Sequence, residues 1–345
     1  MEGKMKALVK MERAPGLELQ EVQIPSTGND DALIRVLATS ICGTDYHIYA
    51  WNEWAQGRIH PPMIAGHEFV GEVVEIGKNV TDVQVGELVT AETHVVCDRC
   101  LQCRMDQRHV CAETGIIGVD RDGCFAEYIA LPAVNLWPTD PDLDLGVASA
   151  QEPLGNAVHT ALAGPVAGAR IAVTGCGPIG LMSIAVLKHC GARQVIATEV
   201  NPFRMELART MGADAVIDVK DGDVVARVLD LTEGVGVDGV LEMSGNATAI
   251  DQALKMVRPG GRVSLLGVPS GAVSLDVAND IVFKGVDVQG IAGRKMWQSW
   301  HQLKSLLASG LDLRDVITHS LPLEAYREGM ELMASGDCGK VVLIP

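Results

Sequence analysis

The segment Ile171-Ala172-Val173-Thr174-Gly175-Cys176-Gly177-Pro178-Ile179-Gly180 decides the fold of this chain. Its first four residues predict a short buried strand, its glycines predict a tight turn, and the apolar run Leu181–His189 predicts a helix starting at that turn. A second strand is expected over Gln194–Thr198, and Glu199 stands nineteen residues after the last glycine. In that context G-x-G-x-x-G is typical of a dinucleotide-binding unit, in which amides at the helix start bind the pyrophosphate.

Glu199 indicates which dinucleotide is bound. A carboxylate at this position can bond both hydroxyls of the adenosine ribose and repels a 2′-phosphate, so we expect NAD rather than NADP. Arg204 favours the opposite choice, because an arginine could accept that phosphate; NAD remains our expectation. The turn itself is expected to contribute Gly175, Gly177, Pro178, Ile179 and Gly180.

Strands and helices continue to alternate after this unit. Strands are expected over 215–219, 239–243, 262–268 and 286–291, with helices near 222–231 and 247–257. Such alternation predicts a parallel, doubly wound sheet. Ligands of these sheets lie beyond the carboxyl ends of the strands, so five further residues are candidates for the cofactor channel: Leu266, Gly267, Val268, Ile291 and Ala292.

The first ninety residues have a different pattern, in which short apolar runs alternate with turn residues. This pattern predicts a β-meander or small barrel that does not bind a dinucleotide. The expected strands are Lys6–Lys10, Leu17–Ile24, Ala32–Ala38, Phe69–Ile76 and Glu87–Thr90.

Two further parts of the chain complete the expected organisation. The crossing to the second domain is expected near 145–163, as two helices interrupted at Glu152-Pro153. The tail predicts helices near 297–309 and 324–334 and a last strand, Lys340–Ile344, which we assign back to the first domain.

Cys42 and the pair His67-Glu68 form a candidate metal site within the β-rich part. A thiolate, an imidazole and a carboxylate are ligands that zinc takes, and three protein ligands leave a tetrahedral position for chemistry. Cys42 alone would more often be a buried thiol, but the three residues together favour zinc. Glu68 could instead orient His67 from outside the coordination sphere.

Four cysteines, Cys97, Cys100, Cys103 and Cys111, follow the spacing C-x2-C-x2-C-x7-C. Four thiolates repel one another without a cation, and a tetrahedral zinc neutralises them. An iron–sulfur cluster is the rival interpretation, but the fourth spacing differs from that motif and no proline follows Cys111. We therefore predict a closed, structural zinc site.

Composition excludes some partners. The chain has 345 residues, 28 Lys+Arg and 44 Asp+Glu, and a formal charge of −16, which disfavours nucleic acid and anionic lipid. Nine cysteines without a secretory leader fit intracellular metal binding better than a disulfide framework. No apolar run reaches the ~18–20 residues that span a bilayer, so we expect a cytoplasmic protein with a small-molecule substrate.

Together these features resemble the zinc-dependent medium-chain alcohol dehydrogenase family over essentially the whole chain. The resemblance rests on Cys42-Gly43-Thr44-Asp45, Gly66-His67-Glu68, the four-cysteine segment and Gly175–Gly180. It implies an α/β fold, in which a GroES-like β-rich catalytic domain carries an inserted Rossmann doubly wound parallel sheet. We place the catalytic zinc-binding domain at 1–155 and 296–345, and the NAD-binding domain at 156–295.

Three stretches, 42–54, 152–160 and 290–294, are similar to members of the family that oxidise the β-hydroxyl of L-threonine with NAD. The resemblance implies 2-amino-3-oxobutanoate and NADH as products, a homotetramer, and one catalytic and one structural zinc per chain. By position it makes Cys42, His67 and Glu68 catalytic zinc ligands. It also implies cofactor contacts at Ile179, Glu199, Arg204, Leu266, Gly267, Val268, Ile291 and Ala292.

The remaining site assignments combine the resemblance with chemistry. The resemblance makes Glu152 an acid near the catalytic zinc, and Thr44 with His47 a proton relay; a hydroxyl and an imidazole three residues apart form a plausible proton path. Taken singly, Thr44 could be a helix cap and His47 a surface histidine. For a substrate carboxylate, Arg294 is the best-placed bidentate donor, with His94 as a weaker helper, although Arg294 could merely pair with an acid.

Three details stay open at this stage. Cys176 stands where alanine is common in relatives, and its thiol could face the cofactor. The same machinery could act on a polyol or a vicinal diol, and a non-enzymatic zinc protein that binds NAD is the alternative from another class. Whether Glu68, Glu152 or water completes the coordination of the catalytic zinc is not decided by the sequence.

Overall fold

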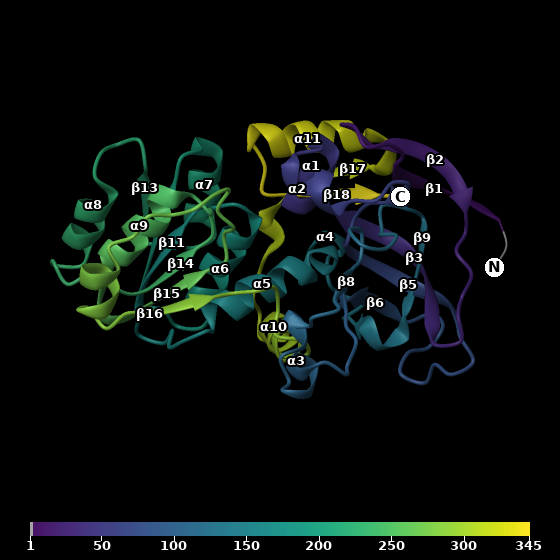
Figure 1. The fold of residues 1–345 in the computed structure, drawn as a ribbon, viewed down its shortest axis with the longest axis horizontal. Coiled ribbons are helices and arrows are strands. Elements are labelled where there is room, and N and C mark those ends of the chain that lie inside the picture. The colour runs from purple at the N-terminus through teal and green to yellow at the C-terminus, as the bar shows by residue number, and fades with distance from the viewer. Residues whose placement is uncertain (1–2) are drawn as a thin grey trace. The chain divides into compact units, whose positions relative to one another are not determined.

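The structure, a computed structural model, describes residues 3–345, which contain two large sheets and two smaller ones (Figure 1). Contacts divide the chain into a first unit, which runs to Glu152 and resumes at Ile317–Pro345, and a second unit, Pro153–Val316. The first unit is therefore made of two chain segments that flank the second. Each unit is described by itself.

The first unit is built on a seven-stranded sheet with the order β10-β6-β5-β3-β18-β17, in which β9 also pairs with β3. A three-stranded sheet, β2-β1-β4, lies beside it in the same unit. The strands are β1 (Lys4–Lys10), β2 (Glu18–Gln23), β3 (Asp31–Ser40), β4 (Met63–Ile64), β5 (Glu68–Ile76), β6 (Leu88–Ala91), β9 (Tyr128–Pro132), β10 (Leu136–Pro138), β17 (Ile317–Pro322) and β18 (Lys340–Ile344).

The pairing of the central strands of this sheet positions the metal-ligand candidate Glu68. In β3 most side chains are buried, on both faces of the strand, as in a strand that is covered on both sides. The antiparallel pairing places Ser40, at the end of β3, opposite Glu68, at the start of β5, and opposite Val342 of β18. The last strand of the chain thus lies in the first unit, which confirms its predicted assignment.

The second unit is a six-stranded parallel sheet with the order β13-β12-β11-β14-β15-β16 (Figure 1). This order is that of a doubly wound dinucleotide-binding sheet and confirms the predicted alternation. The strands are β11 (Arg170–Thr174), β12 (Gln194–Glu199), β13 (Ala215–Asp218), β14 (Val237–Glu242), β15 (Val257–Leu265) and β16 (Asp287–Gly290). The helices are α5 (Gln151–Ala161, starting at the unit boundary), α6 (Pro178–His189), α7 (Pro202–Thr210), α8 (Val224–Leu231), α9 (Ala247–Met256) and α10 (Gln298–Ala308).

The remaining α-helices belong to the first unit: α1 (Gly43–Ala50), α2 (Glu53–Arg58), α3 (Leu101–Arg104), α4 (Leu145–Ser149) and α11 (Tyr326–Ser335). The expected helix break at Glu152-Pro153 was wrong. The break lies at Ala150, and α5 runs through Pro153. Proline is tolerated there because the first turn of a helix has no acceptor for its N–H groups.

The return from the second unit also differs from the predicted boundary at 295/296. Residues 296–316 belong to the second unit, because α10 packs there. Trp300 and Leu303 of α10 are fully buried, and a Cβ on Gly155 of α5 would lie 3.6 Å from Leu303. A sequence pattern gives the helix but not the unit whose core it covers.

Among residues 3–345, none of the helices combines the length and the apolar content that crossing a bilayer requires.

Candidate active site and metal sites

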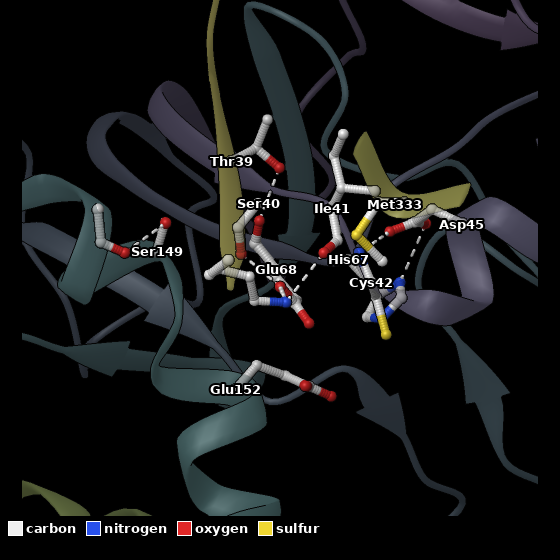
Figure 2. Close-up of polar contacts among 12 residues, drawn as sticks. Thr39, Ser40, Ile41, Cys42, Asp45, His67, Glu68, Ser149, Glu152 and Met333 are labelled. Atoms are coloured by element: carbon white, nitrogen blue, oxygen red, sulfur yellow. Dashed lines mark hydrogen bonds and ion pairs between the residues drawn. The ribbon is translucent and has the colours of Figure 1, made fainter. Parts of the chain in front are cut away.

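Cys42, His67 and Glu68 lie together in the first unit, each with a potential ligand atom within 4.8 Å of the others (Figure 2). Cys42 follows β3 and caps the N-terminus of α1, while His67 and Glu68 stand at the start of β5. Because β3 and β5 pair antiparallel, the end of β3 and the start of β5 are adjacent, and the two sequence motifs lie side by side. The three predicted ligands thus form one cluster.

Asp45 orients His67. Its Oδ1 lies 3.4 Å from His67 Nδ1, and its Oδ2 accepts a 2.8 Å hydrogen bond from the Cys42 amide. Burial lowers the pKa of His67, but the charges of Asp45 and Cys42 outweigh it and raise that pKa well above its usual value. Metal-bound histidines commonly direct their second nitrogen to a carboxylate, so this geometry leaves Nε2 for a metal.

Glu68 is fully buried and is held from one side. Its Oε2 lies 2.5 Å from Lys340 Nζ and accepts a hydrogen bond from Ser40 Oγ. Burial raises the pKa of Glu68, Lys340 and His67 oppose that rise, and the charge of Glu152 adds to it. Its Oε1 has no hydrogen-bond partner among residues 3–345.

Lys340 is a site residue that the sequence did not reveal. The side chain is 2 % exposed, and its ammonium also donates to the carbonyl of Ile41 at 3.0 Å. Burial lowers the pKa of Lys340, but Glu68 and Cys42 outweigh burial and raise it. A lysine within the apolar run Lys340–Ile344 is the only sequence signal of this role.

Thr93 links two predicted site residues, because its side chain hydrogen-bonds Glu152 and His94 follows it in the chain. Glu152, in the first turn of α5, is 5 % exposed, and its Oε1 accepts a 3.1 Å hydrogen bond from Thr93 Oγ1. His94, the next residue, has Nδ1 3.3 Å from the buried carboxylate of Glu92. Figure 2 shows Glu152 beside the cluster of Glu68 and Cys42.

This donor set fits zinc. It offers a sulfur, an imidazole nitrogen and a buried carboxylate oxygen that is without a partner in the described chain, at mutual distances suited to a single ion. An unpaired buried carboxylate oxygen is otherwise expensive, so a cation is the simplest complement. Figure 2 shows these side chains directed toward one another.

The four cysteines of the 97–111 segment also form one cluster, and each is a free thiol. The Sγ atom of Cys111 lies 3.5 Å from that of Cys97 and 3.9 Å from that of Cys100. A tetrahedral zinc with Zn–S bonds of ~2.3 Å separates its sulfurs by ~3.8 Å. A hydrogen bond from the Cys103 backbone lowers the pKa of Cys100 to about 6, whereas burial raises that of Cys103 to about 12, so without a cation these two thiols do not ionise together.

The glycine-rich turn of the second unit fits a pyrophosphate. Gly175 has a φ of +87°, and a Cβ on Gly180 would lie 2.1 Å from the Gly175 carbonyl oxygen. A Cβ on Gly177 would meet no described atom within 4 Å, which leaves room above the start of α6. Pro178 occupies the first turn of this helix, so the amides after it face an open N-terminus.

Glu199 holds the turn together at the end of β12. Its Oε2 accepts a 2.7 Å hydrogen bond from the Cys176 amide, and its Oε1 accepts bonds from the amides of Val200 (2.6 Å) and Asn201 (3.0 Å). The thiol of Cys176 is fully buried instead, and burial raises its pKa. The possibility that this thiol faces the cofactor was therefore wrong.

Glu242, at the end of β14, is a second acid near the dinucleotide turn, and it holds the loops that follow β14 and β15. This residue was not identified from the sequence. Its fully buried carboxylate accepts hydrogen bonds from the amides of Ser244 (2.9 Å) and Gly245 (3.1 Å from Oε2). Its backbone carbonyl accepts from Leu266 and Gly267, both predicted cofactor residues. An acid closing an apolar strand of a parallel sheet is the signal that could have identified it.

The strands predicted over 262–268 and 286–291 end earlier, at Leu265 and Gly290, so the predicted cofactor residues Leu266–Val268, Ile291 and Ala292 lie on the loops that follow. Val268 is 88 % exposed, Ala292 is exposed, and the amide of Ile291 donates to Leu265 at 2.8 Å. Arg204 lies in the first turn of α7, capped by Asn201.

Arg294 is buried in the second unit, at 1 % exposure. A Cβ on Gly155 would come within 2.5 Å of its aliphatic carbons, and its Nη1 donates to Asn156 Oδ1 at 3.1 Å. His159, one turn further along α5, has Nδ1 2.8 Å from the Gly293 carbonyl oxygen. The segment that carries Arg294 is therefore fastened to α5.

The relay candidates lie on α1, the helix that Cys42 caps. Thr44 is partly buried and His47 is exposed, three residues apart on one face of the helix. His47 Nδ1 lies 3.0 Å from Asn52 Nδ2, and its ring meets that of Trp54 edge to face at 6.5 Å.

Two protein-family models match the chain: the alcohol dehydrogenase GroES-like domain at residues 28–141 and the zinc-binding dehydrogenase at 178–309. An L-threonine 3-dehydrogenase of Caldanaerobacter subterraneus subsp. tengcongensis is 54 % identical to this chain over the full length of both proteins.

Solved structures agree with these matches. A zinc-binding dehydrogenase of Sinorhizobium meliloti 1021, solved with NADP, superposes with a TM-score of 0.92 at 30 % identity, covering 99 % of this chain and 100 % of the other. The 2R,3R-butanediol dehydrogenase of Bacillus subtilis gives 0.89 at 27 % identity, covering 99 % of each chain. With its paired metal clusters and its dinucleotide turn, this chain belongs to the zinc-dependent medium-chain dehydrogenase family, and within it to the group of the L-threonine 3-dehydrogenases.

Proposed function

We propose that this enzyme oxidises the β-hydroxyl of L-threonine with NAD+ to L-2-amino-3-oxobutanoate and NADH. The observation that carries the proposal is identity above half of all residues, over the entire chain, with an L-threonine 3-dehydrogenase. The complete cluster of Cys42, His67 and Glu68 supports it, because a protein that only bound NAD would not need this donor set.

The proposed chemistry assigns each group a role. Cys42, His67 and Glu68 would hold a zinc, which would supply Lewis acidity that makes the substrate hydroxyl easier to deprotonate. A bound NAD+ would supply the acceptor for the hydride from the carbon that carries this hydroxyl. Asp45 keeps His67 oriented, and Lys340 with Ser40 holds one oxygen of Glu68. Thr44 and His47 carry the proton outward, and Glu152 lies beside the ligand cluster as a further acid.

The preference for NAD is proposed from Glu199. Three backbone amides already fix its carboxylate, so the negative charge is held where an adenosine ribose would lie. This charge would repel the 2′-phosphate of NADP.

The proposed ligands of the structural zinc are the four cysteines of the 97–111 segment: Cys97, Cys100, Cys103 and Cys111.

For the substrate carboxylate we retain Arg294, with His94 as a helper, as a prediction. The guanidinium is a planar, permanently charged donor suited to a carboxylate. Its burial against Gly155 and its bond to Asn156 would orient it rigidly.

A homotetramer is proposed from two separate apolar surfaces. The first lies along the edge strand β16 and the π-helix Val277–Val282 before it: Val277, Val282, Phe283 and Val288, exposed by 54, 65, 81 and 41 %. The second lies on the four-cysteine segment: Leu101, Met105 and Val110, exposed by 71, 63 and 42 %. Two different self-complementary contacts are what a tetramer with three two-fold axes requires.

The direct test follows NADH absorbance with zinc-loaded enzyme and a panel of L-threonine, L-serine, sorbitol and 2,3-butanediol, each with NAD+ and with NADP+. We expect L-threonine with NAD+ to give the highest kcat/KM. The likeness to a butanediol dehydrogenase makes a diol the second candidate, and a higher kcat/KM on 2,3-butanediol would replace the proposed substrate. A zinc content of two per chain with no turnover of any alcohol would reject the enzyme assignment.

A further inference from the structure

Asn52, directly after α1, contacts the imidazole of His47 and the start of the next helix at the same time. Its Nδ2 lies 3.0 Å from His47 Nδ1, and its Oδ1 accepts a 3.0 Å hydrogen bond from the Ala55 amide as the N-cap of α2. One side chain therefore joins the proposed relay histidine to a helix terminus.

The helix cap fixes which way the Asn52 amide points. An amide N–H can only donate, so the atom facing Ala55 N must be the oxygen of Asn52. The NH2 group then faces His47, and it too can only donate. His47 Nδ1 must therefore be an unprotonated acceptor, and the proton of the neutral ring resides on Nε2.

We infer that Asn52 is a positioning residue that keeps His47 as the neutral Nε2–H tautomer. This inference rests on the proposed relay function of His47. A proton arriving at Nδ1 has to displace the Asn52 N–H, since two N–H groups cannot share the contact. The Nε2–H proton then leaves to water, and the Nδ1–H tautomer that remains is disfavoured because it faces the Asn52 N–H. The ring therefore gives up the Nδ1 proton and regains one at Nε2 from water, which restores the resting tautomer.

The backbone around Asn52 is built for this contact. Trp51 adopts a left-handed conformation, with φ 55° and ψ 47°, which is unfavourable for a bulky residue. The Trp51 amide donates to Ile48 O and the Asn52 amide to His47 O, both at 3.3 Å, which is the hydrogen-bond pattern of a Schellman motif. The reversal of the chain returns Asn52 to the side of His47.

Lys10 and Arg13 hold Trp51 in this conformation. The Lys10 ammonium lies 4.6 Å from the centre of the Trp51 ring and the Arg13 guanidinium 5.7 Å from it. Lys10 is fully buried, and its Nζ donates to the carbonyls of Ala14 and Gly16. Trp51 is itself buried, so its packing and its contacts with the two cations together hold the strained turn.

Asn52→Asp is the decisive variant, because aspartate caps a helix as well as asparagine but accepts from both neighbours. In this variant a carboxylate oxygen faces His47 Nδ1 and should move the proton to that atom. Asn52→Ser retains a cap and is too short to reach the ring, so both tautomers should appear. Asp223→Asn makes the reverse exchange at the N-cap of α8 and serves as the control.

The tautomer is read by 15N solid-state NMR of sedimented protein labelled at the histidine ring nitrogens, with His47→Gln identifying the His47 signals. We expect an unprotonated Nδ1 and a protonated Nε2 in the wild type and in Asp223→Asn, and a protonated Nδ1 in Asn52→Asp. A wild-type His47 protonated at Nδ1, or an unchanged spectrum in Asn52→Asp, would overturn the inference.

Turnover gives a second readout. We expect kcat on L-threonine to fall roughly tenfold in Asn52→Asp, within the range that proton transfer contributes, and to stay unchanged in Asp223→Asn. An unchanged kcat in a variant whose Nδ1 is protonated would disconnect the tautomer from the relay. A wild type that does not oxidise L-threonine would instead reject the proposed substrate, and the NMR result would stand without it.

Discussion

Lys340 Nζ lies 2.5 Å from Glu68 Oε2, and both side chains are buried. The two residues are far apart in sequence, and the pairing of the last strand with β3 brings them together. The ion pair holds one carboxylate oxygen and leaves the other without a partner in the described chain, on the side of Cys42 and His67.

Replacing Lys340 with methionine should destabilise the enzyme strongly. Removal of one partner of a buried ion pair leaves an uncompensated charge and costs about 3–5 kcal/mol of unfolding free energy. Denaturant unfolding of Lys340→Met, Glu68→Gln and the double variant measures this effect. The double variant should be more stable than Lys340→Met alone, because it no longer contains an unpaired buried charge. If the unfolding free energy lost in the double variant equalled the sum of the losses in the two single variants, a direct ion pair would be contradicted.

A matched pair of glycine variants separates cofactor binding from folding. Gly177→Ala adds a Cβ in open space, so the melting temperature should stay unchanged, while the dissociation constant for NADH should rise roughly tenfold because the pyrophosphate loses its close approach. Gly180→Ala places its Cβ against the Gly175 backbone and should lower the melting temperature by several degrees. Calorimetry of NADH binding and thermal unfolding check both; equal effects of the two variants on folding would be inconsistent with the turn described.

Removal of the structural metal should loosen only its own segment. Cys103→Ser removes one of four thiolate ligands, and we expect the zinc content to fall from two per chain to one. Because the segment 97–111 has few buried apolar residues, it should become sensitive to a protease while the dinucleotide unit stays resistant. Metal analysis and limited proteolysis measure the two results. Cys190→Ser, at a cysteine outside both clusters, is the control.

The stability of the protein should rise with pH in a window set by Lys10. Burial lowers the pKa of Lys10 from 10.5 to about 8, so between these values the unfolded chain binds a proton that the folded chain lacks. The free energy of unfolding then increases with pH, by less than ~1.4 kcal/mol per unit for one proton. Lys10→Met abolishes this contribution. The difference in stability between wild type and variant should therefore increase from pH 8 to pH 10.5, and a constant difference would exclude the assignment.

A charged substitution in either apolar surface should split the proposed tetramer into dimers. Phe283→Glu places a charge in the surface beside β16, and Leu101→Glu places one in the surface of the four-cysteine segment. Native mass spectrometry should give four times the chain mass of 36.6 kDa for the wild type and twice that mass for each variant. Val235→Glu, at a third exposed apolar position, should leave the mass unchanged. A monomeric wild type would reject the tetramer.

The sequence determined the class of fold and most of the chemical groups. Its alternation of strands and helices predicted the parallel sheet, because hydrophobic periodicity and turn residues act locally. The two cysteine-containing motifs and the glycine turn were recognisable because metal and phosphate binding need particular residue types at short spacings.

Only the tertiary structure decided how distant segments complete these sites. Lys340 reaches Glu68 because the last strand pairs with β3. Glu242 lies opposite Thr174, the residue before the glycine turn, because β11 and β14 are neighbours in the sheet. Residues 296–316 join the second unit because Trp300 and Leu303 are buried there. The tautomer assigned to His47 depends on a left-handed Trp51 held by Lys10. Such contacts depend on strand pairing and packing between remote parts of the chain, which no local pattern encodes.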